Sequence, residues 1–141
     1  MTAVKITPTK LSGTIQVPPS KSLAHRAIIA ASLAKGISRI DNIEYSKDIQ
    51  ATIKAMVSLG TTIEQYDDYL IIDGTTTYTK QNCEIDCEES GSTLRFMVPI
   101  SIVCSNKVHF TGRGNLGKRP LDTFYEIFDE QNIGYLYKQD I

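Results

Sequence analysis

The sequence predicts an α/β fold built from a repeated unit of strand, helix, strand, helix, strand and strand. Short stretches in which apolar residues alternate with polar ones indicate strands with one buried face. Longer apolar stretches begin at serine N-caps and end at glycines, as helices do. The same series then starts again further along the chain, with Arg26 matched by Arg95 and Gly60 by Gly134. The repetition predicts two copies of one unit.

The first unit is predicted to span about residues 10–74. Its first strand bends or bulges at Gly13, its first helix begins at the N-cap Ser20 and ends before Gly36, and Ser46 caps its second helix. Asp67 and Asp68 form the turn of a closing hairpin. The expected strands are 10–17, 37–43, 61–66 and 69–73, and the expected helices are 20–34 and 46–59.

The second unit is predicted to span about residues 82–141. Its strands are expected at 83–87, 107–111 and 133–137, and its helices at 91–104 and 121–131. Cys83 and Cys87 alternate with acidic residues, so we expect them to face the core as small apolar side chains. Pro99 predicts a kink or short break near Arg95. The unit lacks its final hairpin strand, so we expect a truncated domain.

Composition excludes several classes of protein. The chain has 141 residues, 41% of them hydrophobic, and a net charge of -1 with an isoelectric point near 6.1. This charge balance predicts neither a nucleic acid nor a membrane as the main partner. No apolar run suggests a signal peptide or membrane span, so we expect a cytoplasmic protein. Three cysteines without metal-ligand spacing predict no metal site.

The start of the first helix is a candidate anion site. Lys21, Ser22, His25 and Arg26 fall in its first two turns, where cations are unfavourable beside the positive end of the helix dipole. Unpaired backbone N–H groups, Lys21, Ser22 and Arg26 would together bind a phosphate or carboxylate. The alternative is a solvated helix end. Because apolar residues surround most of this helix, we expect it to be buried, with Arg26 requiring a counter-charge.

Two later stretches carry similar chemistry. Gly91 begins the apolar helix of the second unit and permits close approach to backbone N–H groups, while Glu88 and Glu89 either cap this helix or contact a ligand. The glycine-rich loop 112–120 carries three cations, and Arg119 is expected to supply a further anion contact. The loop lacks the spacing of a nucleotide-binding P-loop, and by itself it could be a solvated turn.

Four linked motifs resemble the 5-enolpyruvylshikimate-3-phosphate synthase family. They are Pro19-Ser20-Lys21-Ser22 with Arg26, Ser46-Lys47-Asp48-Ile49, Glu89-Ser90-Gly91-Ser92-Thr93-Leu94-Arg95 and Lys118-Arg119-Pro120-Leu121. The resemblance implies an enolpyruvyl-transferase-type domain of repeated βαβαββ units with buried helices, an inside-out α/β barrel, of which this chain holds nearly two units. It covers the N-terminal part of the family's chain; the third unit and the second domain are missing.

The resemblance also implies an activity and its residues. The family transfers the enolpyruvyl group of phosphoenolpyruvate to the 5-hydroxyl of shikimate 3-phosphate, in the pathway to aromatic amino acids, without a metal or cofactor. Lys21 would contact both substrates and assist proton transfer, with Asp48 as its charge partner. Ser22 and Arg26 would hold shikimate 3-phosphate, and Gly91 and Arg119 would hold phosphoenolpyruvate. The parent enzyme is expected to be a monomer, and this fragment alone is expected to be inactive.

Two alternatives stay open at this point. UDP-N-acetylglucosamine enolpyruvyl transferase shares the fold, but it usually carries a cysteine in the loop matching 112–119, and this sequence has none there. A non-catalytic module that binds phosphate at its helix starts is the second alternative. Many relatives have Asn where this chain has Glu89, and a carboxylate there would repel phosphoenolpyruvate unless a cation such as Arg95 neutralises it.

Overall fold

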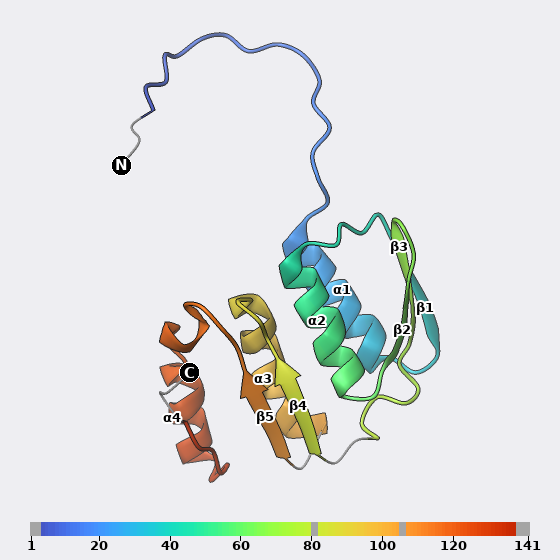
Figure 1. Cartoon of the computed structure of the whole chain (residues 1–141), viewed down its shortest axis with the longest axis vertical. Coiled ribbons are helices and arrows are strands. Elements are labelled where there is room, and N and C mark those ends of the chain that lie inside the picture. The colour runs from blue at the N-terminus through green and yellow to red at the C-terminus, as the bar shows by residue number, and fades with distance from the viewer. Residues whose placement is uncertain (1–3, 80–81, 105–106, 138–141) are drawn as a thin grey trace.

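A computed structural model of the chain describes residues 4–79, 82–104 and 107–137. Helices and strands alternate along it, as the sequence predicts (Figure 1). The elements in order are α1 (Lys21–Leu33), β1 (Ile37–Asp41), α2 (Lys47–Ser58), β2 (Thr62–Gln65), β3 (Tyr69–Asp73), β4 (Asn82–Asp86), α3 (Gly91–Cys104), β5 (Lys107–Thr111), the short 3-10 helix η1 (Leu116–Lys118) and α4 (Asp122–Glu130).

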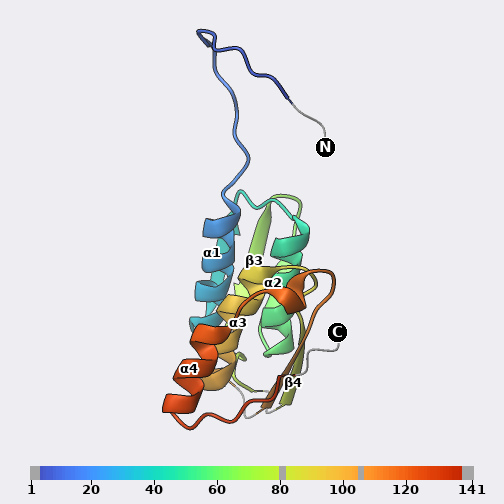
Figure 2. The ribbon, with the colours of Figure 1, turned by 90° about the vertical axis from the view of Figure 1, so that its left-hand side faces the viewer.

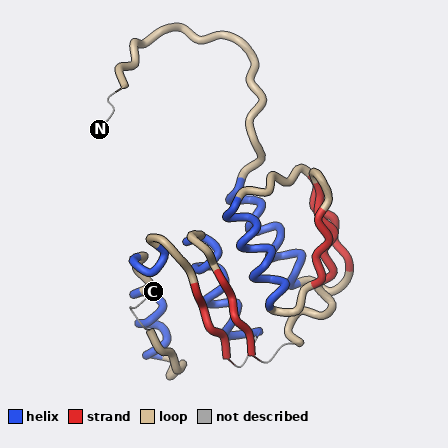
Figure 3. The backbone as a smooth tube through the Cα atoms, in the orientation of Figure 1, coloured by secondary structure: helices blue, strands red, loops and turns tan. Residues whose placement is uncertain are grey.

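Helices α1, α2 and α3 lie inside the sheets, whereas α4 is mostly exposed. Helix α2 packs against α1 on one side and against α3 on the other, and strands contact the outer faces of these helices (Figures 1 and 3). Leu70 and Ile72 of β3, Ile85 of β4 and Met56 of α2 are fully buried between the layers. Their burial supplies the main hydrophobic stabilisation of the fold. The prediction of an α/β fold with helices covered by sheets is confirmed.

The two sheets differ in direction. Strands β1, β3 and β2 form an antiparallel sheet in that order, with Ile37 opposite Asp73 and Thr62 also opposite Asp73. Strands β4 and β5 form a parallel pair, with Cys83 opposite Val108. Helix α3 crosses over between β4 and β5, as a parallel connection requires. The predicted hairpin is confirmed as β2 and β3, and the predicted strands 83–87 and 107–111 as β4 and β5.

The helix boundaries follow the predicted signals. The Ser20 and Ser46 hydroxyls each accept a hydrogen bond at 3.4 Å from the third backbone N–H after them, and these bonds cap α1 and α2. Gly60 ends α2 at a φ of 111°, a conformation that disfavours other residues. Cys87 is fully buried directly after β4, so the prediction that it faces the core is confirmed.

The N-terminal segment contradicts a predicted strand. Residues 4–20 form no strand, and Figures 1 and 2 show them leading away from the folded body. The apolar side chains that predict the strand are all at least 70% exposed: Val4, Ile6, Leu11, Ile15 and Val17. A strand needs a neighbouring edge for its backbone hydrogen bonds, and residues 4–20 pair with none of the described strands. The strand expected at 10–17, with its bulge at Gly13, is therefore wrong for this chain.

Helix α1 is less buried than expected. His25, Ile28 and Ser32 face the interior, whereas Leu23 is 68% exposed and Arg26 is exposed. A helix with apolar residues around its whole circumference still exposes one side when only one side has a packing partner. The prediction that Arg26 is buried and needs a counter-charge is therefore wrong.

A predicted break and a predicted strand in the second unit are wrong. Helix α3 runs without interruption from Gly91 to Cys104, so Pro99 does not break it, while the alternative of a kink stays a prediction. Residues 133–137 form no strand. There, aromatic contacts with α4 replace sheet pairing, since the Tyr135 ring stacks on Tyr125 at 4.9 Å between centroids. No helix in the described part of the chain has the length and apolar character to cross a membrane.

Candidate functional site

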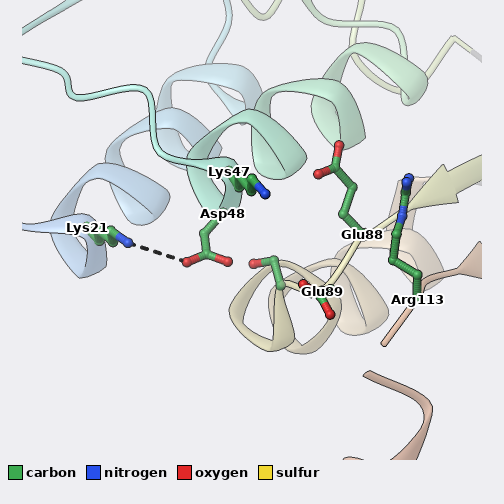
Figure 4. A pocket seen from close by; sticks show the side chains of 7 residues that line it. Lys21, Lys47, Asp48, Glu88, Glu89 and Arg113 are labelled. Atoms are coloured by element: carbon green, nitrogen blue, oxygen red, sulfur yellow. Dashed lines mark ion pairs between the residues drawn. The ribbon is translucent and has the colours of Figure 1, made fainter. Parts of the chain in front are cut away.

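A cavity of about 460 Å³ lies where helices α1, α2 and α3 begin. Figure 4 shows the side chains that point toward it from these helix starts and from the loop after β5. Its lining residues are Lys21, Lys47, Asp48, Glu88, Glu89, Ser90 and Arg113. The three cations balance the three carboxylates in formal charge. An anion bound here would therefore have to draw cationic side chains away from neighbouring carboxylates.

The same local pattern places two of the cations. Lys21 follows the N-cap Ser20, and Lys47 follows the N-cap Ser46, so each lysine lies in the first turn of its helix. Lys21 Nζ lies 3.7 Å from Asp48 Oδ2, and Figure 4 shows the two side chains pointing toward each other. Both are about half exposed, so this pair contributes little to stability. The expected proximity of Asp48 to Lys21 is confirmed.

Arg26 is held on the surface beside Ser22. Its guanidinium donates to the backbone oxygen of Ser22 at 2.8 Å and to the Ser22 hydroxyl. It also lies over the ring of Phe96 in α3, 5.1 Å from the centroid. These contacts orient the guanidinium, which has no carboxylate partner in the part of the chain that the structure describes. Arg26 consequently keeps its full positive charge available to an anionic ligand.

Arg119 lies directly on Gly91. A Cβ at Gly91 would lie 2.8 Å from Arg119 Cδ and 2.9 Å from Nε, so the absence of a side chain makes this contact possible. Within the described residues, the Arg119 guanidinium has neither an ion pair nor a hydrogen bond. The first turn of α3 therefore combines unpaired backbone N–H groups with an adjacent cation, which suits an anion.

The loop 112–119 is fixed by contacts with the end of β4. The Arg113 guanidinium donates to Asp86 Oδ2 at 2.6 Å, and its backbone N–H donates to the Glu88 oxygen at 2.7 Å. Glu88 N–H donates to Asp86 Oδ1 at 2.8 Å. This backbone hydrogen bond, and the bond from Arg113, lower the pKa of Asp86 below its usual value. Leu116 is buried beneath the loop, which sets the position of Arg119.

Glu89 lies against the same loop. Its carboxylate occupies the space in which a side chain at Gly114 would begin, and the φ of Gly114 is 63°. Because Gly114 has no Cβ, the Glu89 side chain can fold onto the loop. Glu89 still lines the cavity, so its charge remains part of the electrostatic environment of any ligand.

A buried polar cluster underlies the cavity. His25 Nδ1 lies 2.7 Å from the Thr52 hydroxyl, which lies 2.8 Å from the Thr93 hydroxyl. The Thr93 hydroxyl donates to the Ser90 hydroxyl at 2.8 Å. Burial lowers the pKa of His25, and the charge of Asp48 partly offsets this effect. Burial therefore favours the neutral form of the His25 imidazole.

The predicted site residues form two groups rather than one. Lys21, Ser22 and Arg26 lie on α1, while Gly91 and Arg119 meet at the start of α3. Arg26 reaches α3 through Phe96, and Lys21 shares the cavity with Ser90, the residue before Gly91. Of the five predicted residues, Lys21 alone lines the cavity itself.

The sequence analysis did not select several cavity residues. Lys47 could have been found because it repeats the position of Lys21 after a serine N-cap. Arg113 could have been found among the cations of the glycine-rich loop, but its pairing with Asp86 depends on how β4 and β5 align. Thr93 stands in the motif at the start of the second apolar helix, whereas Thr52 gives no sequence signal. Among the described residues, no cluster of histidine, cysteine and acidic residues could hold a metal ion.

Several curated relatives are similar over nearly the whole chain. A 3-phosphoshikimate 1-carboxyvinyltransferase of Clostridium perfringens strain SM101 is 59% identical over 141 residues, covering 99% of this chain and 33% of the relative. The protein of the same name from Clostridioides difficile strain 630 is 55% identical over 152 residues, covering 99% of this chain and 34% of the relative. The chain therefore spans about a third of the length of these relatives.

Solved structures share the fold. An EPSP synthase from Acinetobacter baumannii superposes with a TM-score of 0.69 at 23% identity, covering 85% of this chain and 28% of the other. A second structure of an Acinetobacter baumannii EPSP synthase gives a TM-score of 0.68 at 23% identity, covering 84% of this chain and 27% of the other. The sequence model described as EPSP synthase (3-phosphoshikimate 1-carboxyvinyltransferase) matches residues 6–139. Since this match takes in both helix starts and the loop that carries Arg119, the chain belongs to the EPSP synthase family.

Proposed function

We propose that this chain supplies the N-terminal part of a 3-phosphoshikimate 1-carboxyvinyltransferase. The complete enzyme would form a bond between the 5-hydroxyl oxygen of shikimate 3-phosphate and the central carbon of phosphoenolpyruvate, and then release phosphate. For a chain of this family, one observation carries the proposal. Arg26 and Arg119 lie beside the starts of α1 and α3, and neither has a carboxylate partner among the described residues. Two anionic substrates require cations at each of their binding places.

Each predicted site residue takes a role in this proposal. Ser22 and Arg26 hold shikimate 3-phosphate, and their contacts with each other keep them on one face of α1. The Gly91 backbone and Arg119 hold phosphoenolpyruvate at the start of α3. Lys21 contacts both substrates and assists proton transfer at the attacking hydroxyl; the support for this role is that Lys21 lines the cavity together with Ser90, the residue before Gly91.

The proposal includes the organisation of the longer protein. Unit one spans about residues 10–74 and unit two about 82–141, and a third unit and a second domain would complete the enzyme. The ligands would lie between the two domains. We infer a monomeric cytoplasmic enzyme that uses no metal or cofactor and binds neither nucleic acid nor membrane. The 141-residue chain alone is expected to be inactive.

A phosphate-release assay on the full-length enzyme, with both substrates, tests the proposed function. Arg26→Ala and Lys21→Met should each lower kcat/KM by roughly a hundredfold or more, because each removes a charged substrate contact. Both side chains are exposed, so circular dichroism should show an unchanged fold. Arg39→Ala is the matched control, because Arg39 is an exposed arginine on β1 that is paired with Asp41.

Two outcomes would contradict the proposal. Normal turnover in either site variant would remove these residues from the active site. Binding of shikimate 3-phosphate by calorimetry, without phosphate release from phosphoenolpyruvate in the wild-type enzyme, would instead indicate a phosphate-binding module.

A further inference from the structure

Four buried side chains form a hydrogen-bonded chain from α1 to the start of α3. His25 Nδ1 contacts the Thr52 hydroxyl at 2.7 Å, and the Thr52 and Thr93 hydroxyls are 2.8 Å apart. The Thr93 hydroxyl reaches Ser90 Oγ at 2.8 Å. Thr52 and Thr93 are fully buried, while His25 and Ser90 are 3% exposed. Water therefore does not compete with these bonds, and each hydroxyl proton must be shared among the protein atoms present.

The protons in this chain can be assigned from the Ser90 end. The Thr93 hydroxyl donates to Ser90 Oγ, with the Asp48 carbonyl oxygen as a second, longer acceptor at 3.4 Å. A hydroxyl has only one proton to donate, so Thr93 must accept in its contact with Thr52. The Thr52 hydroxyl therefore donates its own proton to Thr93. It must consequently accept from His25, which requires a hydrogen atom on His25 Nδ1.

This assignment leaves one proton without an acceptor. Ser90 Oγ accepts from the backbone N–H of Thr93 at 3.2 Å and from the Thr93 hydroxyl, so both of its lone pairs are used. The Ser90 hydroxyl proton has no acceptor among these four hydrogen-bonded side chains. Ser90 lines the cavity together with Lys21 and Asp48, and it precedes Gly91. Burial favours the neutral form of His25, so the direction of donation does not depend on a charged imidazole.

We infer that the Ser90 hydroxyl donates a hydrogen bond to phosphoenolpyruvate at the start of α3, and that His25 is a positioning residue that fixes this donor through Thr52 and Thr93. The inference rests on the proposed function, because it takes phosphoenolpyruvate as the anion. If the imidazole is removed, Thr93 can donate to Thr52 instead. Ser90 can then donate back to Thr93, and its proton is withdrawn from the ligand.

Substitution of Ser90 in the full-length enzyme tests the first part. Ser90→Ala should raise KM for phosphoenolpyruvate by roughly 10- to 100-fold, the effect of losing a hydrogen bond to a charged group, and leave KM for shikimate 3-phosphate within about twofold. Ser90→Gly should behave alike; glycine is a good N-cap residue, so this variant separates the lost hydroxyl from a weakened helix start. An unchanged KM for phosphoenolpyruvate in both variants would overturn the inference.

A double-mutant cycle tests the role of His25. His25→Leu should raise KM for phosphoenolpyruvate about threefold to tenfold in the wild-type background, but should have no further effect in the Ser90→Ala background. His25→Asn should restore the wild-type KM, because the side-chain amide N–H lies near the place of Nδ1–H. An undiminished His25→Leu effect in the Ser90→Ala background would show that His25 does not act through Ser90.

Thr77→Val is the matched control for lost buried hydrogen bonds. Thr77 is 3% exposed, and its hydroxyl contacts Thr61 at 2.8 Å and the Ser32 oxygen at 2.6 Å, away from the cavity. Thr77→Val should lower the melting temperature, as Thr52→Val should, without changing KM for phosphoenolpyruvate. A change in KM for phosphoenolpyruvate in Thr77→Val would assign all these effects to general destabilisation. Failure of the proposed function would look different, because the wild-type enzyme would then release no phosphate.

Discussion

Arg26 and Arg119 show how individual residues can hold a guanidinium in place without neutralising its charge. Each guanidinium is oriented by uncharged groups: the Ser22 oxygens and the Phe96 ring for Arg26, and the Gly91 backbone for Arg119. A carboxylate partner would have neutralised the charge, and a ligand would have had to displace it. Uncharged partners hold the side chain in place and leave its electrostatic attraction intact.

Gly91→Ala is the prediction at this scale. The new methyl group would meet Arg119 at 2.8 Å, so the arginine must move away from the helix start. We expect KM for phosphoenolpyruvate to rise about tenfold or more, and KM for shikimate 3-phosphate to rise less. Steady-state kinetics with each substrate varied in turn measures both. Gly117→Ala is the control, since a Cβ there meets nothing within 4 Å, and equal effects of Gly91→Ala on both substrates would contradict the placement of Arg119.

At the scale of the elements, the loop 112–119 depends on the turn that follows β4. Glu88 has a φ of 52°, which is unfavourable for a residue with a side chain. Asp86 stabilises this turn by accepting a hydrogen bond from Glu88 N–H, and it also binds Arg113 of the loop. One carboxylate thereby connects the turn before α3 to the loop that carries Arg119.

Asp86→Asn should lower the free energy of unfolding by about 1 kcal/mol at pH 7, a modest value because the carboxylate is partly exposed. Because these bonds lower the pKa of Asp86 from 3.8, its contribution is present above that pH and is lost as the pH falls through the lowered pKa. Urea unfolding of wild type and variant at several pH values measures the difference. The difference in free energy of unfolding between wild type and variant should shrink below pH 3.8, and a constant difference down to pH 2 would contradict this account.

Glu84→Gln is the control for Asp86→Asn. The Glu84 side chain is 71% exposed, and its Oε1 atom lies 3.7 Å from His109 Nδ1, which is a long contact. Removal of the Glu84 charge should therefore change the free energy of unfolding little.

At the scale of the whole molecule, the N-terminal segment and the helical interior contrast. Helices α1, α2 and α3 pack side by side with sheets outside them (Figures 1 and 2). The N-terminal segment instead exposes Val4, Ile6, Leu11, Ile15 and Val17. Exposed apolar residues on an extended segment suit a strand that pairs with a sheet in another part of a longer protein.

Hydrogen exchange should reveal that pairing. In the full-length enzyme, amides of residues 10–17 should exchange slowly, because they are bonded in a sheet and covered by apolar contacts. In the 141-residue chain they should exchange within seconds, as unprotected amides do. Mass spectrometry of exchanged peptides makes the comparison, with the α2 peptide 47–58 as a reference that is protected in both. Rapid exchange of residues 10–17 in both proteins would contradict the expected pairing.

Elements whose signals are local can be predicted from the sequence. Serine caps and closing glycines indicate α1 and α2, and alternation indicates β1 to β5. The two repeated units and the anion binding at their helix starts stay predictions. Local signals fail where structure depends on a distant partner. Residues 10–17 and 133–137 have the composition of strands, but a strand exists only where another edge accepts its hydrogen bonds.

The packing of elements against one another sets which side of α1 is buried and how the cavity is assembled. The meeting of Arg119 with Gly91, the binding of Arg113 to Asp86 and the buried path from His25 to Ser90 all join residues from different elements. Thr52 is ordinary in sequence, and it contacts His25 and Thr93 only because helix packing brings the three side chains together. Contacts of this kind depend on the relative placement of whole elements, and sequence periodicity does not contain that information.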